Sequence, residues 1–250
     1  MHMDRTAAKE TTGEAGNAIH LLEVDEDLAA AIPEEDRELA ARNLVVPVQH
    51  LEPGRATGLE QDPHPGGMLL VDGFMTRDVE FAGQCSRELL GTGDLLRPWD
   101  FERDYHPPFS EAGFTVMEPT TLALLDDRVL RFGARWPMLV DELLRRATQR
   151  SRWLAIRLAI GGVTRIDERV LLFLWHAAGR WGQVTPAGIA LRFHLTHAVL
   201  AELIGAERPS VTSALSRLRR CGRLICERGT TGTAFILVGD PPGGVSQEPD

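Results

Sequence analysis

The sequence has few cysteines and no long hydrophobic run. Its three cysteines, Cys85, Cys221 and Cys226, are scattered and odd in number, which argues against a disulfide framework and makes a reducing cytoplasm the expected location. No stretch of about eighteen or more apolar residues occurs, so no transmembrane span is expected. Residues 1–17 are polar and lack the apolar core of a secretory signal, so no such signal is expected either.

Motifs of common catalytic and metal sites are also missing. The sequence contains no glycine-rich phosphate loop, no HExxH helix and no GxSxG turn. Cys221 and Cys226 have no further ligands beside them, and His64 and His106 each precede a proline, which is typical of surface loops. We therefore expect no enzymatic activity, no metal site and no resident cofactor.

Charge is distributed unevenly along the chain. The whole chain has a formal net charge of −9, but residues 163–238 hold ten arginines and five acidic residues, a local charge of +5. The composition is otherwise ordinary for a globular protein, with 43% hydrophobic and 25% charged residues. An acidic body with a basic C-terminal module indicates that this module has an anionic partner.

Residues 44–125 contain many short strand patterns, which follow a tail expected to be disordered (residues 1–18) and a short helical segment at 29–42. The apolar run 68–71 meets Asp72-Gly73, a dipeptide that favours a two-residue hairpin turn because both positions tolerate positive φ. Gly91-Thr92-Gly93-Asp94 predicts another turn. Many short strands with glycine and proline between them predict a β-sandwich or barrel.

A long helix is predicted from Pro137 to Ile160, because no glycine or further proline occurs there. Six of its residues alternate at spacings of four and three: Val140, Leu144, Ala147, Ser151, Leu154 and Leu158. This repeat of about 3.5 residues is typical of two helices packed side by side. The alternative is a helix packed on its own domain. The flanking residues are mostly arginines (Arg145, Arg146, Arg150, Arg152 and Arg157) and leave little apolar surface for a core, so we expect a dimer interface. Gly161-Gly162 is expected to form a hinge.

The C-terminal module begins with another predicted helix. Asp167 is expected to cap it, and Gly179 is expected to end it after Ala178. Residues 184–189, with proline at the second turn position and glycine at the fourth of the central turn, predict a small hairpin.

Two capped helices follow the hairpin. Thr196 caps residues 197–204, Gly205 ends them, and Pro209 opens a helix that stops near Gly222. The second helix has an apolar inner face of Val211, Ala214, Leu215 and Leu218. Two helices joined by a tight glycine-containing turn predict a helix-turn-helix, and a hairpin around residues 229–232 predicts its wing.

The outer face of the second helix suits DNA. Ser210, Thr212 and Ser213 are small enough to enter the major groove. Arg208 at the helix entrance can donate two hydrogen bonds to guanine, worth about 1–3 kcal/mol of discrimination. Phosphate contacts are expected from Thr196, His197, Arg217, Arg219, Arg220 and Arg228. The alternative, a structural bundle with a solvated basic face, is disfavoured by the combination of caps, turn and wing.

Residues 195–215, LTHAVLAELIGAERPSVTSAL, resemble the helix-turn-helix of the cAMP receptor protein (Crp/Fnr) superfamily. The family pattern has a threonine, Leu-Ala, a glycine and then an arginine that opens the recognition helix, and the upstream hairpin at 181–186 also fits. The resemblance implies an α+β fold and a homodimer that binds a two-fold symmetric DNA site. Its implied parts are a β-roll sensor-like domain of the cyclic-nucleotide-binding jelly-roll type (19–130), a dimerisation helix and hinge (131–162), a winged-helix DNA-binding domain (163–238) and a disordered tail (239–250).

The sequence departs from the family pattern in two places. In the recognition helix Arg208 is kept, but Pro209 and Ser213 stand where family members often have Glu and a second Arg, so a Crp-type operator is not expected. In the sensor, cyclic-nucleotide binders follow the Gly-x-Gly-Asp turn with Gly-Glu and later an arginine for the phosphate, and both are missing here. Binding of cAMP is therefore not expected. Arg97 and Arg103 are weak candidates for binding another anion, and the effector is unknown.

Two classes of function remain at this point. The first is a homodimeric transcription regulator that binds double-stranded DNA, with RNA polymerase as a further candidate partner and no membrane association. The second is a ligand-sensing or protein-interaction module whose winged helix docks a protein. The arginines on the recognition face favour the first. The sequence leaves the operator, the target genes and the direction of regulation open.

Overall fold

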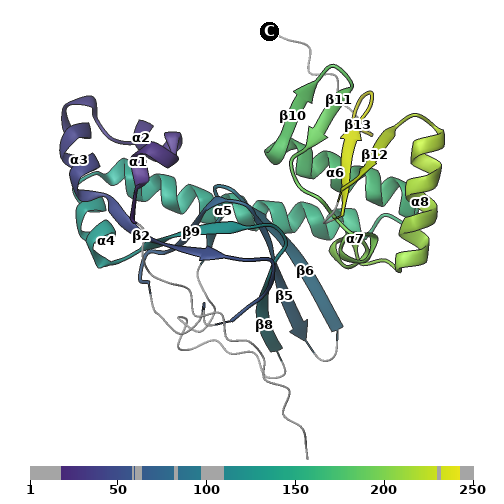
Figure 1. The fold of residues 1–250 in the computed structure, drawn as a ribbon, viewed down its shortest axis with the longest axis horizontal. Coiled ribbons are helices and arrows are strands. Elements are labelled where there is room, and N and C mark those ends of the chain that lie inside the picture. The colour runs from purple at the N-terminus through teal and green to yellow at the C-terminus, as the bar shows by residue number, and fades with distance from the viewer. Residues whose placement is uncertain are drawn as a thin grey trace, which may run out of the picture.

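The computed structural model describes residues 18–57, 59, 64–81, 84–96, 110–229 and 232–242. A long helix, α5 (Pro137–Gly161), runs across the whole molecule. A β-rich half with small helices lies along its first part, and a compact helical unit with its own small sheet lies at its C-terminal end (Figure 1). The described helices include none that is both long and apolar enough to cross a membrane.

The β-rich half is a sandwich of two antiparallel sheets. The first sheet has the order β1 (Ala18–His20), β2 (Val45–Leu51), β9 (Thr120–Leu125), β4 (Gly67–Asp72) and β7 (Leu95–Leu96). The second has the order β3 (Gly54–Ala56), β8 (Ser110–Val116), β5 (Phe74–Phe81) and β6 (Gln84–Gly91). Side chains from both sheets, such as Met68, Met75 and Leu122, are buried between them. The predicted β-roll architecture is confirmed.

The hairpin predicted at Asp72-Gly73 is wrong. Strand β4 pairs with β9 and β7, whereas β5 pairs with β6 and β8, so the dipeptide turns the chain from one sheet to the other. Gly73 does have a positive φ of 93°, and a Cβ there would lie 2.4 Å from the carbonyl oxygen of Pro119. Gly73 therefore adopts the positive φ that the dipeptide favours, but the strands before and after it pair with other strands and not with each other.

Small helices close the end of the sandwich beside the start of α5. They are α1 (Leu21–Val24), α2 (Glu26–Ala30), a 3-10 turn (Glu34–Asp36), α3 (Arg37–Asn43) and α4 (Asp127–Gly133). Their apolar residues share one core with the first sheet, and the Trp136 Nε1–H donates to the Asp36 carboxylate at 2.8 Å. The predicted helical segment 29–42 is interrupted at Pro33, which precedes the 3-10 turn. The predicted tail, 1–18, lies outside the described residues except for Ala18, which begins β1.

Helix α5 has two different faces. Leu139, Trp153 and Ile160 are buried against the chain's own core. The leucines of the predicted dimer stripe are exposed instead, with Leu144 at 63% and Leu158 at 80% exposure. The sequence predicts that the flanking arginines leave little apolar surface for a core, but Arg146, Arg150 and Arg157 themselves turn inward, where they bind other groups of the chain.

The C-terminal unit is a winged helix. It consists of α6 (Ile166–Trp181), β10 (Gly182–Thr185), β11 (Gly188–Leu191), α7 (His197–Ile204), α8 (Arg208–Arg220), β12 (Leu224–Arg228) and β13 (Thr233–Leu237). Its sheet has the order β10-β11-β13-β12, so the predicted hairpin at 184–189 and the wing hairpin are both present. The predicted inner face of α8 is buried at all four positions.

Both predicted ends of α6 are wrong. Arg165, not Asp167, occupies the N-cap, and the helix continues through Gly179 to Trp181. Trp181 is buried among Phe74, Trp153 and Phe193, with ring centroids 5.2–6.0 Å away. The burial of a large aromatic ring outweighs the modest cost of glycine inside a helix, which is about 1 kcal/mol.

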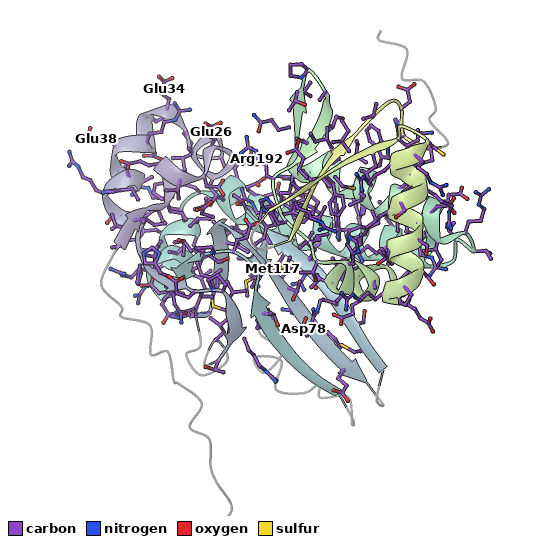
Figure 2. The ribbon with its side chains drawn as sticks, turned by 45° about the vertical axis from the view of Figure 1, so that its right-hand side comes forward. Glu26, Glu34, Glu38, Asp78, Met117 and Arg192 are labelled. Carbon is purple, nitrogen blue, oxygen red and sulfur yellow. The ribbon has the colours of Figure 1, made fainter. Side chains whose placement is uncertain are left out.

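The winged helix is docked on the sandwich of its own chain. The carboxylate of Asp94, in the turn after β6, accepts a hydrogen bond from Arg180 of α6 at 2.7 Å. Arg87 of β6 pairs with Asp78 in the sheet and with Glu202 of α7, each at 2.7 Å. Figure 2 shows Asp78 on the sheet below this junction, and Met117 close to the junction itself. These contacts fix the orientation of the winged helix relative to α5.

Candidate nucleic-acid interface

The helix-turn-helix forms as its local signals predict. The Thr196 Oγ1 accepts a hydrogen bond from the Val199 N–H at 3.2 Å and so caps α7. Gly205 ends α7 in the left-handed conformation, with φ 63° and ψ 51°, where glycine avoids the steric cost of a side chain. Pro209 lies in the first turn of α8, where its missing N–H has no helical partner to lose.

The exposed face of α8 combines a narrow centre with basic edges. Since residues of an α-helix are about 100° apart, Pro209, Ser213, Ser216 and Arg220 lie opposite the buried face, so the narrow part of this centre ends at Ser216. Arg208 and Arg219 lie along one edge of this face, and Arg217 lies along the other. Figure 1 shows α8 at the outer end of the molecule, beyond α7 and away from the β-sandwich. Within the described part of the chain, the β-sandwich therefore does not lie over this helix.

One group of predicted residues meets where α7, α8 and the wing come together. The His197 Nδ1 lies 2.9 Å from the Thr212 Oγ1, which donates to the Arg208 carbonyl oxygen at 3.0 Å. Partial burial, and then the charges of Arg208 and Arg228, hold the pKa of His197 below its ordinary value. Thr196 precedes His197 at the same end of α7. These five residues thus form one basic surface, called here the entrance cluster.

A second group lies between α8 and the start of α6. Ser210, Ser213 and Arg217 line a hollow of about 640 Å³ together with Arg165 and Asp167. The Asp167 carboxylate accepts from Arg165 at 3.0 Å, and this hydrogen bond lowers the pKa of Asp167. The same carboxylate lies 3.8 Å from the Arg217 Nε, so part of the Arg217 charge is compensated. Arg165 was not among the residues predicted from the sequence, although a basic residue just after a glycine hinge and before a helix is a recognisable signal.

Arg220 belongs to a third part of the surface. It lines a shallow hollow with Ser216, Arg219 and strand β12 (Ile225 and Cys226). The tip of the wing, residues 230–231, lies outside the described residues. The acidic residues Glu26, Glu34 and Glu38 lie on the small helices at the other end of the molecule (Figure 2). These three carboxylates therefore lie away from the basic face of α8.

Two arginines hold the helix-turn-helix in place, and the sequence analysis missed this role of both. Arg169 of α6 donates to the carbonyl oxygen of Val163 at 2.6 and 2.9 Å and to that of Gly205 at 3.0 Å. Arg157 of α5 donates to the carbonyl oxygen of Leu203. The C-terminal end of α7 is thereby tied both to the hinge and to the long helix. No local pattern reveals such contacts, because the acceptors are backbone oxygens far along the chain.

A cavity lies between the second sheet and α5. The weak effector candidates Arg97 and Arg103 lie outside the described residues. The cavity has a volume of about 450 Å³. Its lining combines apolar side chains, two hydroxyls and charged groups: Arg77, Val79, Ser86, Glu88, Leu95, Ala147, Arg150, Ser151, Leu154 and Arg157.

The comparisons with known proteins agree with this architecture. Residues 168–242 match the family model described as the Crp-like helix-turn-helix domain. A cyclic nucleotide-binding domain containing protein from Listeria monocytogenes EGD-e has a similar structure (16% identity, TM-score 0.60, 86% of this chain and 97% of that chain). So do FixK2 from Bradyrhizobium japonicum (18%, 0.57, 78% and 94%) and TTHB099, a transcriptional regulator of the CRP family from Thermus thermophilus (17%, 0.53, 76% and 91%). No curated protein matches the sequence.

At these low identities, the structural likeness shows a shared fold. The family model adds that the C-terminal unit is of the Crp-like type, which confirms the resemblance seen in residues 195–215. Among the structural neighbours, TTHB099 is described as a transcriptional regulator. The chain therefore has the α+β fold of the Crp/Fnr transcription regulators and carries their helix-turn-helix domain.

Proposed function

We propose that the protein is a homodimeric regulator that binds a specific, two-fold symmetric DNA site through α8. The observation that carries the proposal is the exposed face of α8, where Pro209, Ser213 and Ser216 lie along the centre, Arg220 follows them in the last turn, and further arginines lie along both edges. An exposed helix of this kind fits the major groove, and the basic edges suit the two phosphate backbones. The distance of α8 from the acidic helices also favours an anionic partner.

Within this proposal, one set of residues reads the bases and another set contacts the phosphates. Arg208 begins α8 and is the candidate for reading a base edge, with Ser210, Thr212 and Ser213 beside it. The candidates for phosphate contacts are Thr196, His197, Arg217, Arg220 and Arg228. Because each phosphate contact releases counterions, affinity is expected to fall steeply as salt rises. Base readout, by contrast, determines which sequence is bound.

The exposed stripe of α5 supports the homodimer. Val140, Leu144, Leu154 and Leu158 are each at least 37% exposed, and they repeat at the spacing of a two-helix seam. Exposed leucines in a row on one helix are costly in water unless another surface covers them. A second copy packed along the stripe would place two α8 helices about a common axis. Two half-sites about one helical turn apart are then expected in the DNA.

The cavity beneath α5 is the candidate effector site. Ala147, Ser151 and Leu154 belong to both the cavity lining and the dimer stripe, so a partner helix packed on the stripe would lie against the cavity. A ligand there could favour one arrangement of the dimer over another.

The test is a selection of the full-length protein against random duplex DNA at about 150 mM salt, a condition under which phosphate attraction alone binds weakly. We expect a two-fold motif with half-sites about ten base pairs apart. Arg208→Ala should weaken binding and relax one base position. The control is Arg42→Ala, which removes an exposed arginine of α3 far from α8. Binding that ignores sequence and barely responds to salt would contradict the proposal and favour a winged helix that docks a protein.

A further inference from the structure

The last turns of α8 and the start of strand β12 enclose a shallow hollow of about 530 Å³, called here the α8–β12 hollow. Figure 1 shows β12 between β13 and α8. The lining residues are Ser216, Arg219, Arg220, Leu224, Ile225 and Cys226. Ile225 is a large apolar side chain, yet it is 40% exposed. The hollow therefore combines apolar residues of a strand with two arginines of the recognition helix.

The arginines around this hollow have no carboxylate partner within the part of the chain that the structure describes. The guanidinium groups of Arg219 and Arg220 form no hydrogen bond or ion pair with the described residues. Arg223, just before β12, donates to the carbonyl oxygen of Asp240 at 2.6 Å, and its Nε is buried without a hydrogen-bond partner. The acid of β12, Glu227, is exposed and pairs with none of the three. Uncompensated arginines gathered in this way attract an anionic partner.

The chain returns to the hollow at its last described residues. Leu237 of β13 is paired with Leu224, and the Val238 N–H donates to the Arg223 carbonyl oxygen at 3.1 Å. Residues 243–250 follow shortly afterwards and lie outside the described residues. Eight residues of extended chain span at most about 29 Å. This segment therefore starts beside the hollow and is long enough to cross it.

The segment 243–250, GGVSQEPD, is complementary to the hollow in charge and polarity. It contains Glu248 and Asp250 and no basic residue, so its charge is −2. Val245 supplies an apolar side chain, and Gly243-Gly244 before it permit many backbone conformations. Because the segment is tethered close to the hollow, its effective concentration there is of millimolar order, which favours even a weak contact.

We propose that residues 243–250 dock in the α8–β12 hollow, with Val245 against Ile225 and the two carboxylates on the arginines, and that they shield this part of α8 from DNA. The docking stands on the hollow and the charges alone. The shielding rests on the proposed DNA-binding function, because Arg220 lies on the exposed face of α8, where phosphates would compete with the carboxylates. Docking therefore lowers DNA affinity, most strongly at low salt, since salt screens charge pairs at the surface.

Docking is tested by alkylation of Cys226 with iodoacetamide, measured by mass spectrometry on the full-length protein. Cys226 lines the hollow and is partly buried, so a docked segment restricts access to its thiol. Cys85 is exposed on strand β6 of the sandwich and serves as the internal standard. The quantity compared between variants is the alkylation rate at Cys226 divided by the rate at Cys85.

The test variant is Glu248→Gln with Asp250→Asn, which removes the charge of the segment and keeps its length. The matched control is Glu34→Gln with Glu35→Gln, which removes the same charge from an exposed turn of the small helices. We expect the relative rate at Cys226 to rise about three-fold in the test variant, as for a hollow that is occupied about two-thirds of the time, and to stay constant in the control. Equal rates in the native protein and the test variant would overturn the docking.

The assignment of the carboxylates to the arginines is tested with Arg220→Gln. By itself this change should raise the relative rate at Cys226. In the test variant it should add nothing, because the charge pair is already lost; additive effects would refute the pairing. Protection of Cys226 that grows with protein concentration would mean that the segment comes from another copy, and it would overturn docking within one chain.

Shielding is tested by the affinity of the same variants for the selected operator and for random duplex DNA, at about 50 mM and about 300 mM salt. Relative to the matched control, the test variant should bind about three-fold more tightly at the lower salt and equally at the higher. Equal affinity at both would refute the shielding. A two-fold DNA motif without protection of Cys226 would leave the proposed function standing and refute this inference. Protection of Cys226 without any DNA motif would leave the docking standing and contradict the proposed function.

Discussion

The buried pair of Asp94 and Arg180 offers a sharp test of the junction between the sandwich and the winged helix. The Asp94 side chain is 3% exposed and Arg180 is 17% exposed. One Asp94 oxygen accepts from Arg180 at 2.7 Å, and the other accepts from the Gly91 N–H at 2.9 Å. The perturbation is Arg180→Met, which keeps an apolar stem of similar length but leaves the Asp94 charge without its cation.

The expected loss in free energy of unfolding is about 3–5 kcal/mol at pH 7, the typical cost of leaving one member of a buried ion pair uncompensated. The Arg180 guanidinium also lies 4.9 Å from the centre of the Trp181 ring, and its removal adds about 0.5–1 kcal/mol. Burial already raises the pKa of the Asp94 carboxyl, and loss of Arg180 must raise it further. A buried carboxyl whose pKa is raised in the native state destabilises the fold least at a pH at which it is protonated. The damage should therefore grow as pH rises and shrink in acid.

The assay is urea denaturation followed by tryptophan fluorescence at several pH values. The double variant Asp94→Asn with Arg180→Met should recover most of the loss, because the neutral amide can still accept from Gly91 and leaves no buried charge. Arg42→Met, which breaks an exposed pair with Glu38, is the matched control and should cost about 0.3–0.5 kcal/mol. A loss in free energy of unfolding below about 1 kcal/mol, or no recovery in the double variant, would refute the reasoning. Removing one member of a buried ion pair is strongly destabilising, whereas replacing both members is much less so.

Three other predictions concern the interface, the dimer and the turn. Operator affinity should rise as pH falls through the titration range of His197, because partial burial and neighbouring arginines lower its pKa in the free protein and DNA phosphates favour its charged form; binding titrations should show this, and His197→Gln should remove the pH dependence. Leu144→Glu should shift the protein to monomers in sedimentation equilibrium, whereas Val184→Glu, at a more exposed apolar position outside α5, should not. Dimers in both variants would exclude the exposed stripe of α5 as the dimer interface. Gly205→Ala should cost about 1–2 kcal/mol in urea denaturation, from its positive φ alone, because a Cβ there meets no atom within 4 Å; a much larger loss would mean that the turn is more tightly packed than the structure shows.

The helix-turn-helix could be predicted from the sequence because its signals are local. Thr196, Gly205 and Pro209 act within one turn of the helix that each one begins or ends, so neighbouring residues alone determine the outcome. The buried face of α8 and the exposed stripe of α5 follow from helical periodicity for the same reason. The roles of the individual DNA-contacting residues remain predictions.

Predictions failed where distant contacts compete with local preference. Asp167 has the chemistry of a helix cap, yet its carboxylate pairs with Arg165, two residues away, and lies 3.8 Å from the Arg217 Nε of α8. Gly179 has the chemistry of a helix stop, yet the helix continues because Trp181 packs in an aromatic pocket built largely by other segments. At Gly179 the tertiary interaction is worth more than the propensity, which amounts to about 1 kcal/mol.

The sequence by itself determined which residues share a face of each helix, where the recognition helix begins, and that the C-terminal module is basic. It also placed Arg146, Arg150 and Arg157 on one helix. Only the tertiary structure decided what those arginines meet, since Glu88 lies 62 residues before Arg150 and Leu203 lies 46 residues after Arg157. Periodicity is a property of the backbone and can be read locally. Charge compensation depends on which distant groups the fold brings within reach, and so the cavity and its link to α7 became visible only in three dimensions.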